Sequence, residues 1–476
     1  MQDDPDARVC VYVSEQEDLG AIRRYLQASA HSGEIAQIDL RYLPAETSLI
    51  RRHGLLWLPG AYVVPGGRFN EFYGWDSCFI QRGLWRDAHE SLALSVCEQA
   101  LYEVRHYGMV LNANRTYYLT RSHPPMLGSM VAECYHYTGD CNWLERALPE
   151  VLRAYHYWMV PPHLNQGSGL SRYRDYGHGP AAEVLLGEVD ERGYNHYDRI
   201  RDYLATADLG GWARERYYDA ERHALTLNAY LNDRSMRESG FDISHRFGPM
   251  NLEVVSFAPV CLNTFLWIAE RELAQFHREL GQGTAADFWR RAADRRAERF
   301  HHYFWDESAG LFFDFHLERR ERYAYPYLTT FLPLWAGLAS PVQAERVAEN
   351  AEMFLAPGGL QTSVTTTGCQ WDAPFAWAPL HLFAVGGLLN YGFEQQAREI
   401  ARRFLDTVDS DFRRHGHFLE KYDATSRVSD VGSQLAFGYT TNEVGFGWTN
   451  AVVLEFLDFL ETGTLRTPSQ AETFVS

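Results

Sequence analysis

Five loop regions of the sequence combine carboxylates or amides with large aromatic rings. They are PGGRFNEFYGWDSCF (65–79), LNANRTYYLTRSHPP (111–125), SGFDISHRFG (239–248), TTTGCQWDAPFAWAPL (365–380), and FLEKYD (418–423) with GFGWTN (445–450). Loops that carry charged side chains beside rings are more often functional than structural. A sugar accounts for this mixture, because polar side chains bond its hydroxyls while rings cover its apolar face. The pattern therefore predicts a carbohydrate-binding cleft.

Cleavage of a glycosidic bond would explain the carboxylates in these loops. The reaction needs one carboxyl group to protonate the leaving oxygen and a second to activate water or to attack. Each carboxylate could instead cap a helix or pair with an arginine, so the residues alone leave open which two react. The candidates are Asp76, Asp242, Asp372, Glu420 and Asp423.

The sequence lacks the motifs that several other kinds of enzyme chemistry require. The sequence contains no HExxH, GxSxG, GxGxxG or P-loop pattern. The histidine-rich stretches at 176–180 and 301–302 have no second cluster of metal ligands beside them. We therefore expect neither a metal nor an organic cofactor.

Charge, cysteine content and hydropathy indicate which partners and which cellular compartment to expect. The net charge of -18 disfavours nucleic acid and anionic membranes, which leaves a small molecule as the expected partner. Seven scattered cysteines without a CxxC motif are typical of reduced thiols. The N-terminus lacks the apolar region of a signal peptide, and no apolar run is long enough to cross a membrane. These features predict a cytoplasmic protein.

Helical periodicity dominates the chain from Asp87 onward. Further periodic stretches are 126–138, 142–159, 256–280, 284–304, 341–355, 378–391, 394–409 and 449–461. A solenoid would show an internal sequence repeat, and the sequence has none. An all-α closed double ring of helices therefore fits the pattern better. Loops at one end of such a ring would converge on a central cleft.

We expect three parts along the chain. Residues 1–57 form an N-terminal segment with a short strand (VCVYV, 9–13) and a helix, 58–462 form the catalytic domain, and 463–476 form a tail. The charged stretch 184–232 is either an insertion that could act as a lid or a solvated helical hairpin.

Two of the loops resemble the trehalase family. PGGRFNEFYGWDS resembles its first signature and QWDAPFAWAP its second, while SGFD, EKYD and GFGWTN are similar to its later blocks. The resemblance covers about residues 58–462. It implies an (α/α)6 toroid with a few short strands in loops. It also implies an inverting α-glucosidase mechanism without metal or organic cofactor.

The resemblance also implies roles for single residues. Asp242 would be the general acid and Glu420 the general base. Gly240 would let the backbone approach the sugar closely. Glu71 has no sugar role from the resemblance, and we expect it to brace Arg68. The residues expected to bind the substrate are Arg68, Phe69, Trp75, Asp76, Asn112, Arg121, His123, Glu183, Gly240, Gln370, Trp371, Asp372, Tyr439 and Trp448.

Several positions depart from the family pattern. His123 stands where the family has Gln, Ala181 where it has Arg, and Tyr439 where it has Glu, and the segment after Glu183 is longer. Losing an arginine and a glutamate removes partners for hydroxyls on the leaving-group side, which changes specificity strongly. The main hypothesis is therefore hydrolysis of a small compatible-solute α-glucoside, with glucosylglycerol favoured.

Other functions stay open. Trehalose is the family's default substrate. Glucosylglycerate is less favoured, because its anionic leaving group would want the missing arginine. A phosphorylase would need a phosphate pocket in place of Glu420. A non-catalytic sugar-binding protein would not need both carboxylates.

Overall fold

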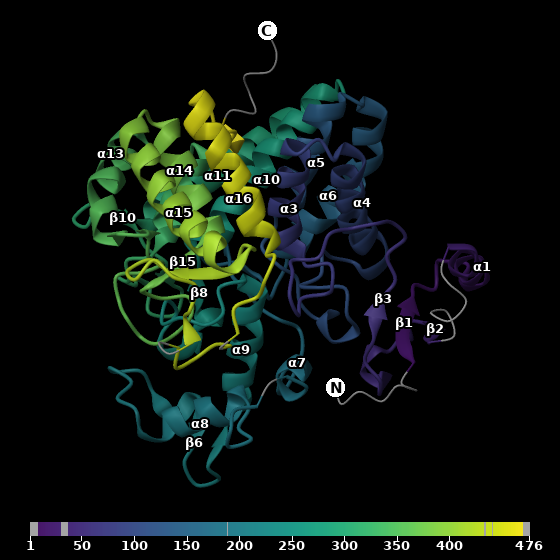
Figure 1. The fold of residues 1–476 in the computed structure, drawn as a ribbon, viewed down its shortest axis with the longest axis horizontal. Helices are drawn as coiled ribbons and strands as arrows, with labels where there is room; N and C mark the ends of the chain where they lie inside the picture. Colours follow the sequence, from purple (N-terminus) through teal and green to yellow (C-terminus); the bar gives the residue numbers. More distant parts are fainter. Residues whose placement is uncertain (1–7, 30–36, 188, 433–434, 440, 470–476) are drawn as a thin grey trace.

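Six inner helices form a closed ring in the computed structural model, which describes residues 8–29, 37–187, 189–432, 435–439 and 441–469. Each packs on the next, and the last packs back on the first. In ring order they are α3 (Gly74–Arg86), α5 (Leu127–Thr138), α10 (Val260–Glu279), α12 (Leu332–Ala336), α14 (Ala378–Asn390) and α16 (Gly447–Thr462). This arrangement confirms the predicted (α/α)6 toroid (Figure 1).

Amphipathic helices lie outside this ring. In α15, for example, Ala397, Ile400, Ala401 and Phe404 are buried while the charged positions between them face outward. That periodicity is why the sequence predicted these helices well. The outer helices are α4 (Glu90–Tyr107), α6 (Cys141–Trp158), α11 (Gly283–Phe304), α13 (Pro341–Glu349) and α15 (Glu394–His415).

The sequence did not predict α3, α9 (Leu227–Ser239) or the short buried helix α12, and the physical reason is clearest for α3 and α9. Helix α3 is buried almost all round, including Gln81 and Arg82, so it shows no polar face. Helix α9 buries Asn232 and Asp233 among other polar side chains, which resemble a solvated stretch in the sequence. Both helices lead directly into or out of the predicted cleft loops.

The N-terminal segment forms a small parallel sheet beside the ring (Figure 1). Its strand order is β2 (Ile38–Tyr42), β1 (Val9–Val13), β3 (Leu55–Leu56), and α1 (Leu19–Ser29) connects β1 to β2. The predicted strand at 9–13 is confirmed.

The other strands are short and lie in the loops between helices. They are β4 (Leu164–Asn165), β5 (Leu170–Ser171), β8 (Phe257–Ala258), β9 (Trp305–Asp306), β10 (Leu311–Phe312), β11 (Phe315–His316), β12 (Glu321–Arg322), β13 (Leu355–Ala356), β14 (Gly359–Leu360), β15 (Phe375–Trp377) and β16 (Lys421–Asp423). Among the described residues, no helix is long and apolar enough to span a membrane.

The insertion is not the helical hairpin that its composition suggested. It contains a single turn α7 (Ala182–Leu185), one longer helix α8 (His196–Thr206), and a β-hairpin of β6 (Tyr218–Asp219) and β7 (Ala224–Leu225). Figure 1 shows α8 and β6 below the ring, next to the lower end of α9. We keep the name insertion for residues 182–187 and 189–226, which overlap the expected stretch 184–232.

Candidate active site

A cavity of about 730 Å³ lies where the loops preceding the inner helices meet. Trp75 and Asp76 stand at the start of α3, Gln370 precedes α14, and Trp448 opens α16. All the residues predicted to act on the substrate line this cavity except Asp372. Segments far apart in the sequence are therefore brought together as the ring closes.

Asp242 follows the C-terminal end of α9. Burial raises the pKa of its carboxyl to about 6, while the nearby charge of Arg237 opposes the rise. Its backbone oxygen accepts a hydrogen bond from Nε2 of Gln370. A carboxyl with a raised pKa that still opens onto the cavity suits a general acid.

Glu420 is held at both carboxylate oxygens. The hydroxyl of Tyr439 donates a hydrogen bond to Oε1, and Nζ of Lys421 lies 3.3 Å from Oε2. The indole of Trp448 donates to the Glu420 backbone oxygen at 3.0 Å. An oriented carboxylate beside a cation suits a general base.

Asp76 is the third carboxyl group of the cavity. Burial raises its pKa to about 8, and the charges of Glu420 and Asp242 add to the rise. It is therefore protonated at neutral pH and can both donate and accept hydrogen bonds. A neutral acid of this kind suits the binding of a sugar hydroxyl.

His123 is an uncharged ring. Burial, with Arg121 nearby, lowers its pKa to about 3. The backbone N–H of Trp75 donates to its Nδ1 at 3.2 Å. A neutral imidazole that accepts at Nδ1 carries its proton on Nε2, so His123 offers one donor to the cavity.

Tryptophans form the floor of the cavity. Trp371 stacks on Trp377 with ring centroids 3.9 Å apart and planes 2° apart. Trp75 and Trp448 pack edge-on against each other at 5.9 Å. Such rings provide a rigid apolar surface for one face of a sugar.

The charged partners in the first motif differ from our expectation. Glu71 forms an ion pair with Arg115, which also lines the cavity. Arg68 is braced by Glu443 instead, which accepts its backbone N–H at 2.9 Å and lies 3.4 Å from its Nε. The Arg68 guanidinium covers the ring of Tyr439 at 4.4 Å. The sequence analysis missed Glu443 because the family spacing pointed to Tyr439.

Arg121 lines the cavity although its side chain is almost fully buried. It pairs with Glu183 and lies 3.4 Å from Asp175. Burial alone would raise the pKa of Glu183, but the charges of Arg121 and Arg237 outweigh it and lower the pKa below its usual value. Asn112 donates to the backbone oxygen of Arg237 at 3.1 Å. These contacts fix the wall that the insertion shares with α9.

The carboxylates of Asp372 and Asp423, two of the candidates, are occupied by hydrogen bonds within the protein. Asp372 accepts hydrogen bonds from Tyr325, Thr367 and the backbone of His245, and it does not line the cavity. Asp423 accepts from two backbone N–H groups of the turn that follows it. Neither carboxylate is presented to a ligand in the cavity.

Gly240 has a reason beyond close approach of the sugar. Its φ is +74°, and an added Cβ would lie 2.9 Å from the indole of Trp75. Any other residue would strain the backbone and displace the ring. Gly240 therefore positions both Trp75 and Asp242.

Several cavity residues had no signal in the family motifs. His196 and Arg199 come from α8 of the insertion, and Arg237 comes from the last turn of α9. His53 also lines the cavity, whereas the further lining residues Arg115 and Phe446 come from loops that the sequence analysis singles out. The insertion thus contributes directly to the site.

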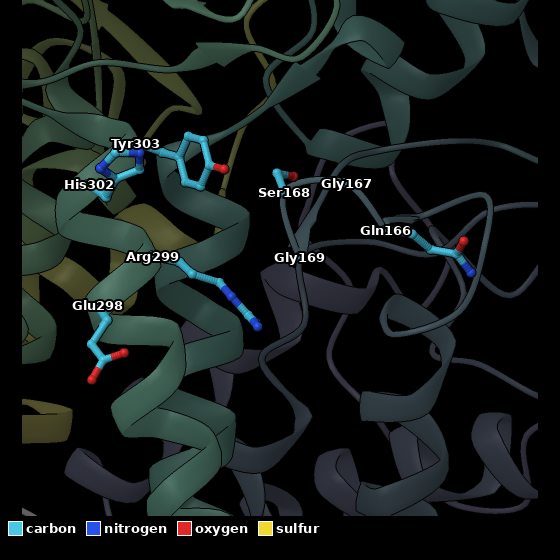
Figure 2. Close-up of a pocket in the computed structure, with 8 residues that line it drawn as sticks. All are labelled: Gln166, Gly167, Ser168, Gly169, Glu298, Arg299, His302 and Tyr303. Carbon is cyan, nitrogen blue, oxygen red and sulfur yellow. The ribbon is translucent and has the colours of Figure 1, made fainter.

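A second hollow of about 410 Å³ lies between α11 and the loop at 166–169. Figure 2 shows Arg299 extending toward the loop at Gly169, while Gln166 points away. Glu298 is the one carboxylate among its lining residues. This hollow lacks the carboxyl pair needed for glycoside cleavage.

A helical toroid with two carboxylates over an aromatic floor is the arrangement of a glycoside-cleaving protein. The chain matches the sequence model of the trehalase family over residues 15–461. A periplasmic trehalase of Xanthomonas campestris is 31% identical over 97% of this chain and 82% of its own length. The protein therefore belongs to the trehalase family.

Fungal relatives are longer than this chain. The cytosolic neutral trehalase of Kluyveromyces lactis is 33% identical over 91% of this chain but 64% of its own length. The solved neutral trehalase of Saccharomyces cerevisiae superposes with a TM-score of 0.79 at 29% identity, covering 98% of this chain and 90% of that one. A mannosylglycerate hydrolase of Thermus thermophilus shares the fold alone, with a TM-score of 0.55 and 20% identity over 84% of this chain and 96% of that one.

Proposed function

We propose that the protein hydrolyses α,α-trehalose to two glucose molecules with inversion at the anomeric carbon. The observation that carries the proposal is the presence of Asp242 and Glu420 in one cavity, each in surroundings suited to a different role. The relatives compared above that are 29% identical or more are named trehalases, which favours trehalose over glucosylglycerol.

In the proposed reaction, Asp242 donates its proton to the glycosidic oxygen as the bond to the anomeric carbon breaks. Glu420 removes a proton from a water molecule, and the water oxygen bonds to the anomeric carbon from the opposite face. The transition state has oxocarbenium character, so nearby carboxylates stabilise it. The cleaved sugar leaves as β-glucose.

The glucose unit whose anomeric carbon is attacked contacts the protein with its hydroxyls and with one face of its ring. Arg68 and the neutral Asp76 offer donors to hydroxyls, and Trp75 offers an apolar surface. The interleaving of charges and rings in PGGRFNEFYGWD follows from this double contact.

Glucosylglycerol is the second candidate substrate, and one observation favours it. The hydroxyl of Tyr439 donates to Glu420, so it is engaged with the base rather than with a hydroxyl of the leaving group. A leaving group with fewer hydroxyls than glucose would need fewer partners.

Glucose release from a substrate panel tests the proposal. Trehalose, glucosylglycerol, glucosylglycerate, kojibiose and sucrose are compared by kcat/KM. The highest value with trehalose supports the proposal. The highest value with glucosylglycerol would assign the second candidate, and no release from any α-glucoside would overturn both.

We also propose a cytoplasmic location. The described structure contains free cysteines, of which Cys141 is exposed and Cys10, Cys78, Cys97, Cys134, Cys261 and Cys369 are buried. Reduced thiols are typical of the cytoplasm. Fractionation of the native cell tests this, and recovery with the periplasmic proteins would contradict it.

A further inference from the structure

The guanidinium of Arg237 lies close to two carboxylates, those of Asp233 and Asp242. Nε and Nη2 donate to Asp233 at 3.0 and 3.2 Å, in a two-point contact. The remaining nitrogen, Nη1, lies 3.8 Å from Oδ2 of Asp242. A purely structural ion pair would be complete with Asp233, whereas this arginine also presents a charge to the carboxyl assigned as general acid.

Asp233 is fixed by the insertion. Nε2 of His196 lies 3.0 Å from its Oδ1, and the hydroxyl of Tyr197 donates to its Oδ2 at 2.8 Å. The side chain of Asp233 is 2% exposed, so these contacts leave it little freedom. The orientation of Arg237 is therefore set by two residues of α8.

The same network reaches the position where the family resemblance implied an arginine. The backbone N–H of Ala181 donates to the Tyr197 hydroxyl at 2.8 Å. Position 181 is thus connected to Arg237 through Tyr197 and Asp233. A guanidinium is present in the cavity, but it enters from α9 rather than from the segment at 181.

We propose that Arg237 is a positioning residue for Asp242, and that Asp233, His196 and Tyr197 hold it beside the acid. This inference rests on the proposed function, because it concerns the protonation of the leaving oxygen. At 3.8 Å the contact with Asp242 is beyond hydrogen-bond length, so it acts through charge. The insertion thereby controls proton donation.

Several charged groups act on Asp242 besides Arg237. Arg121 also favours its ionised form, whereas Asp233 disfavours it. Asp76 and Tyr439 share the cavity and interact with its charge. Removing Arg237 leaves Arg121 as the remaining cation of this set, so the protonated form of Asp242 should persist to higher pH.

The test compares Arg237→Gln and Arg237→Lys with the wild type on two substrates. Trehalose needs a proton on its leaving oxygen, whereas α-glucosyl fluoride releases fluoride without one. We expect Arg237→Gln to lower kcat/KM on trehalose about 100-fold and on the fluoride no more than about threefold. Its basic pH limb on trehalose should move up by about one unit, and Arg237→Lys should restore part of both effects.

Arg201→Gln is the matched control. Arg201 lies on α8 in ion pairs with Asp198 and Asp202 and does not line the cavity, so wild-type profiles are expected. Equal losses on both substrates, or an unmoved basic limb, would overturn the proposal. If the wild type leaves trehalose intact but cleaves another α-glucoside of the panel, the proposed function fails, and the same comparison of that glucoside with the fluoride tests Arg237 independently.

Discussion

The hydroxyl of Tyr439 donates a hydrogen bond to Oε1 of Glu420, the carboxylate assigned as general base. The same ring lies beneath the Arg68 guanidinium at 4.4 Å and near Nζ of Lys421 at 3.8 Å. Tyr439 therefore joins the base to the group that binds the sugar. A glutamate at this position would instead place a second negative charge beside the base.

Tyr439→Phe should lower kcat on trehalose by about 10- to 100-fold, because the base loses a donor that orients it. Tyr439→Glu should move the acidic limb of kcat/KM to higher pH, since two adjacent carboxylates resist ionising together. Steady-state kinetics against pH measures both effects. Tyr137→Phe on the surface is the control, and an unchanged acidic limb in Tyr439→Glu would contradict the assignment of the base.

The general acid should set the basic side of the pH profile. Asp242 must be protonated to donate, and burial raises its pKa to about 6. The protonated fraction falls as pH rises through that value, so kcat/KM on trehalose should decline above about pH 6. Asp242→Asn should lower it by about 1000-fold or more, with a much smaller loss on α-glucosyl fluoride. Activity that stays level to pH 8 would assign the acid elsewhere.

Glu443 should act through Arg68. Glu443→Gln keeps the shape of the side chain but removes the charge that fixes the guanidinium. We expect kcat/KM to fall about 10-fold, chiefly through KM. A double-mutant cycle with Arg68→Lys measures the coupling, and effects that simply add would show that the two residues act independently.

Glu272 should link stability to pH. Burial between α5 and α10 raises its pKa to about 8, although Ser129 donates to it at 2.6 Å. Because the folded pKa exceeds the usual 4.5, the stabilising effect of its proton is fully present below that pH and is lost as pH rises toward 8.

Glu272→Gln has no proton to lose. Its free energy of unfolding relative to wild type should rise by about 2 kcal/mol between pH 5 and pH 8.5, as measured by urea denaturation. Glu298→Gln, on the exposed surface of α11, should show no such change. A pH-independent difference for Glu272→Gln would refute the buried neutral acid.

Many of the residues predicted to form the site lie together because their loops precede inner helices. Trp75, Gln370 and Trp448 are far apart in the chain, yet closure of the ring brings their loops to one end. Asp372 shares the motif composition but lies behind the cavity, where Tyr325 and Thr367 occupy its oxygens. Composition alone does not separate a carboxylate that faces a ligand from one that braces a loop.

The charged part of α9 could not be interpreted from sequence. Asp233, Arg237 and Glu238 resemble a solvated helix face, but the structure buries them in ion pairs and hydrogen bonds. The partners of Asp233 come from the insertion, whose contacts no periodicity predicts. Burial of charge depends on tertiary partners, which is why this network was missed.

Proton NMR of the first products from trehalose tests inverting hydrolysis most directly. Inversion at one anomeric carbon releases β-glucose, while the leaving sugar keeps its α configuration. Before mutarotation, we therefore predict α- and β-glucose in equal amounts. Formation of α-glucose alone would show retention, and the assignment of Glu420 as a base that activates water would then be wrong.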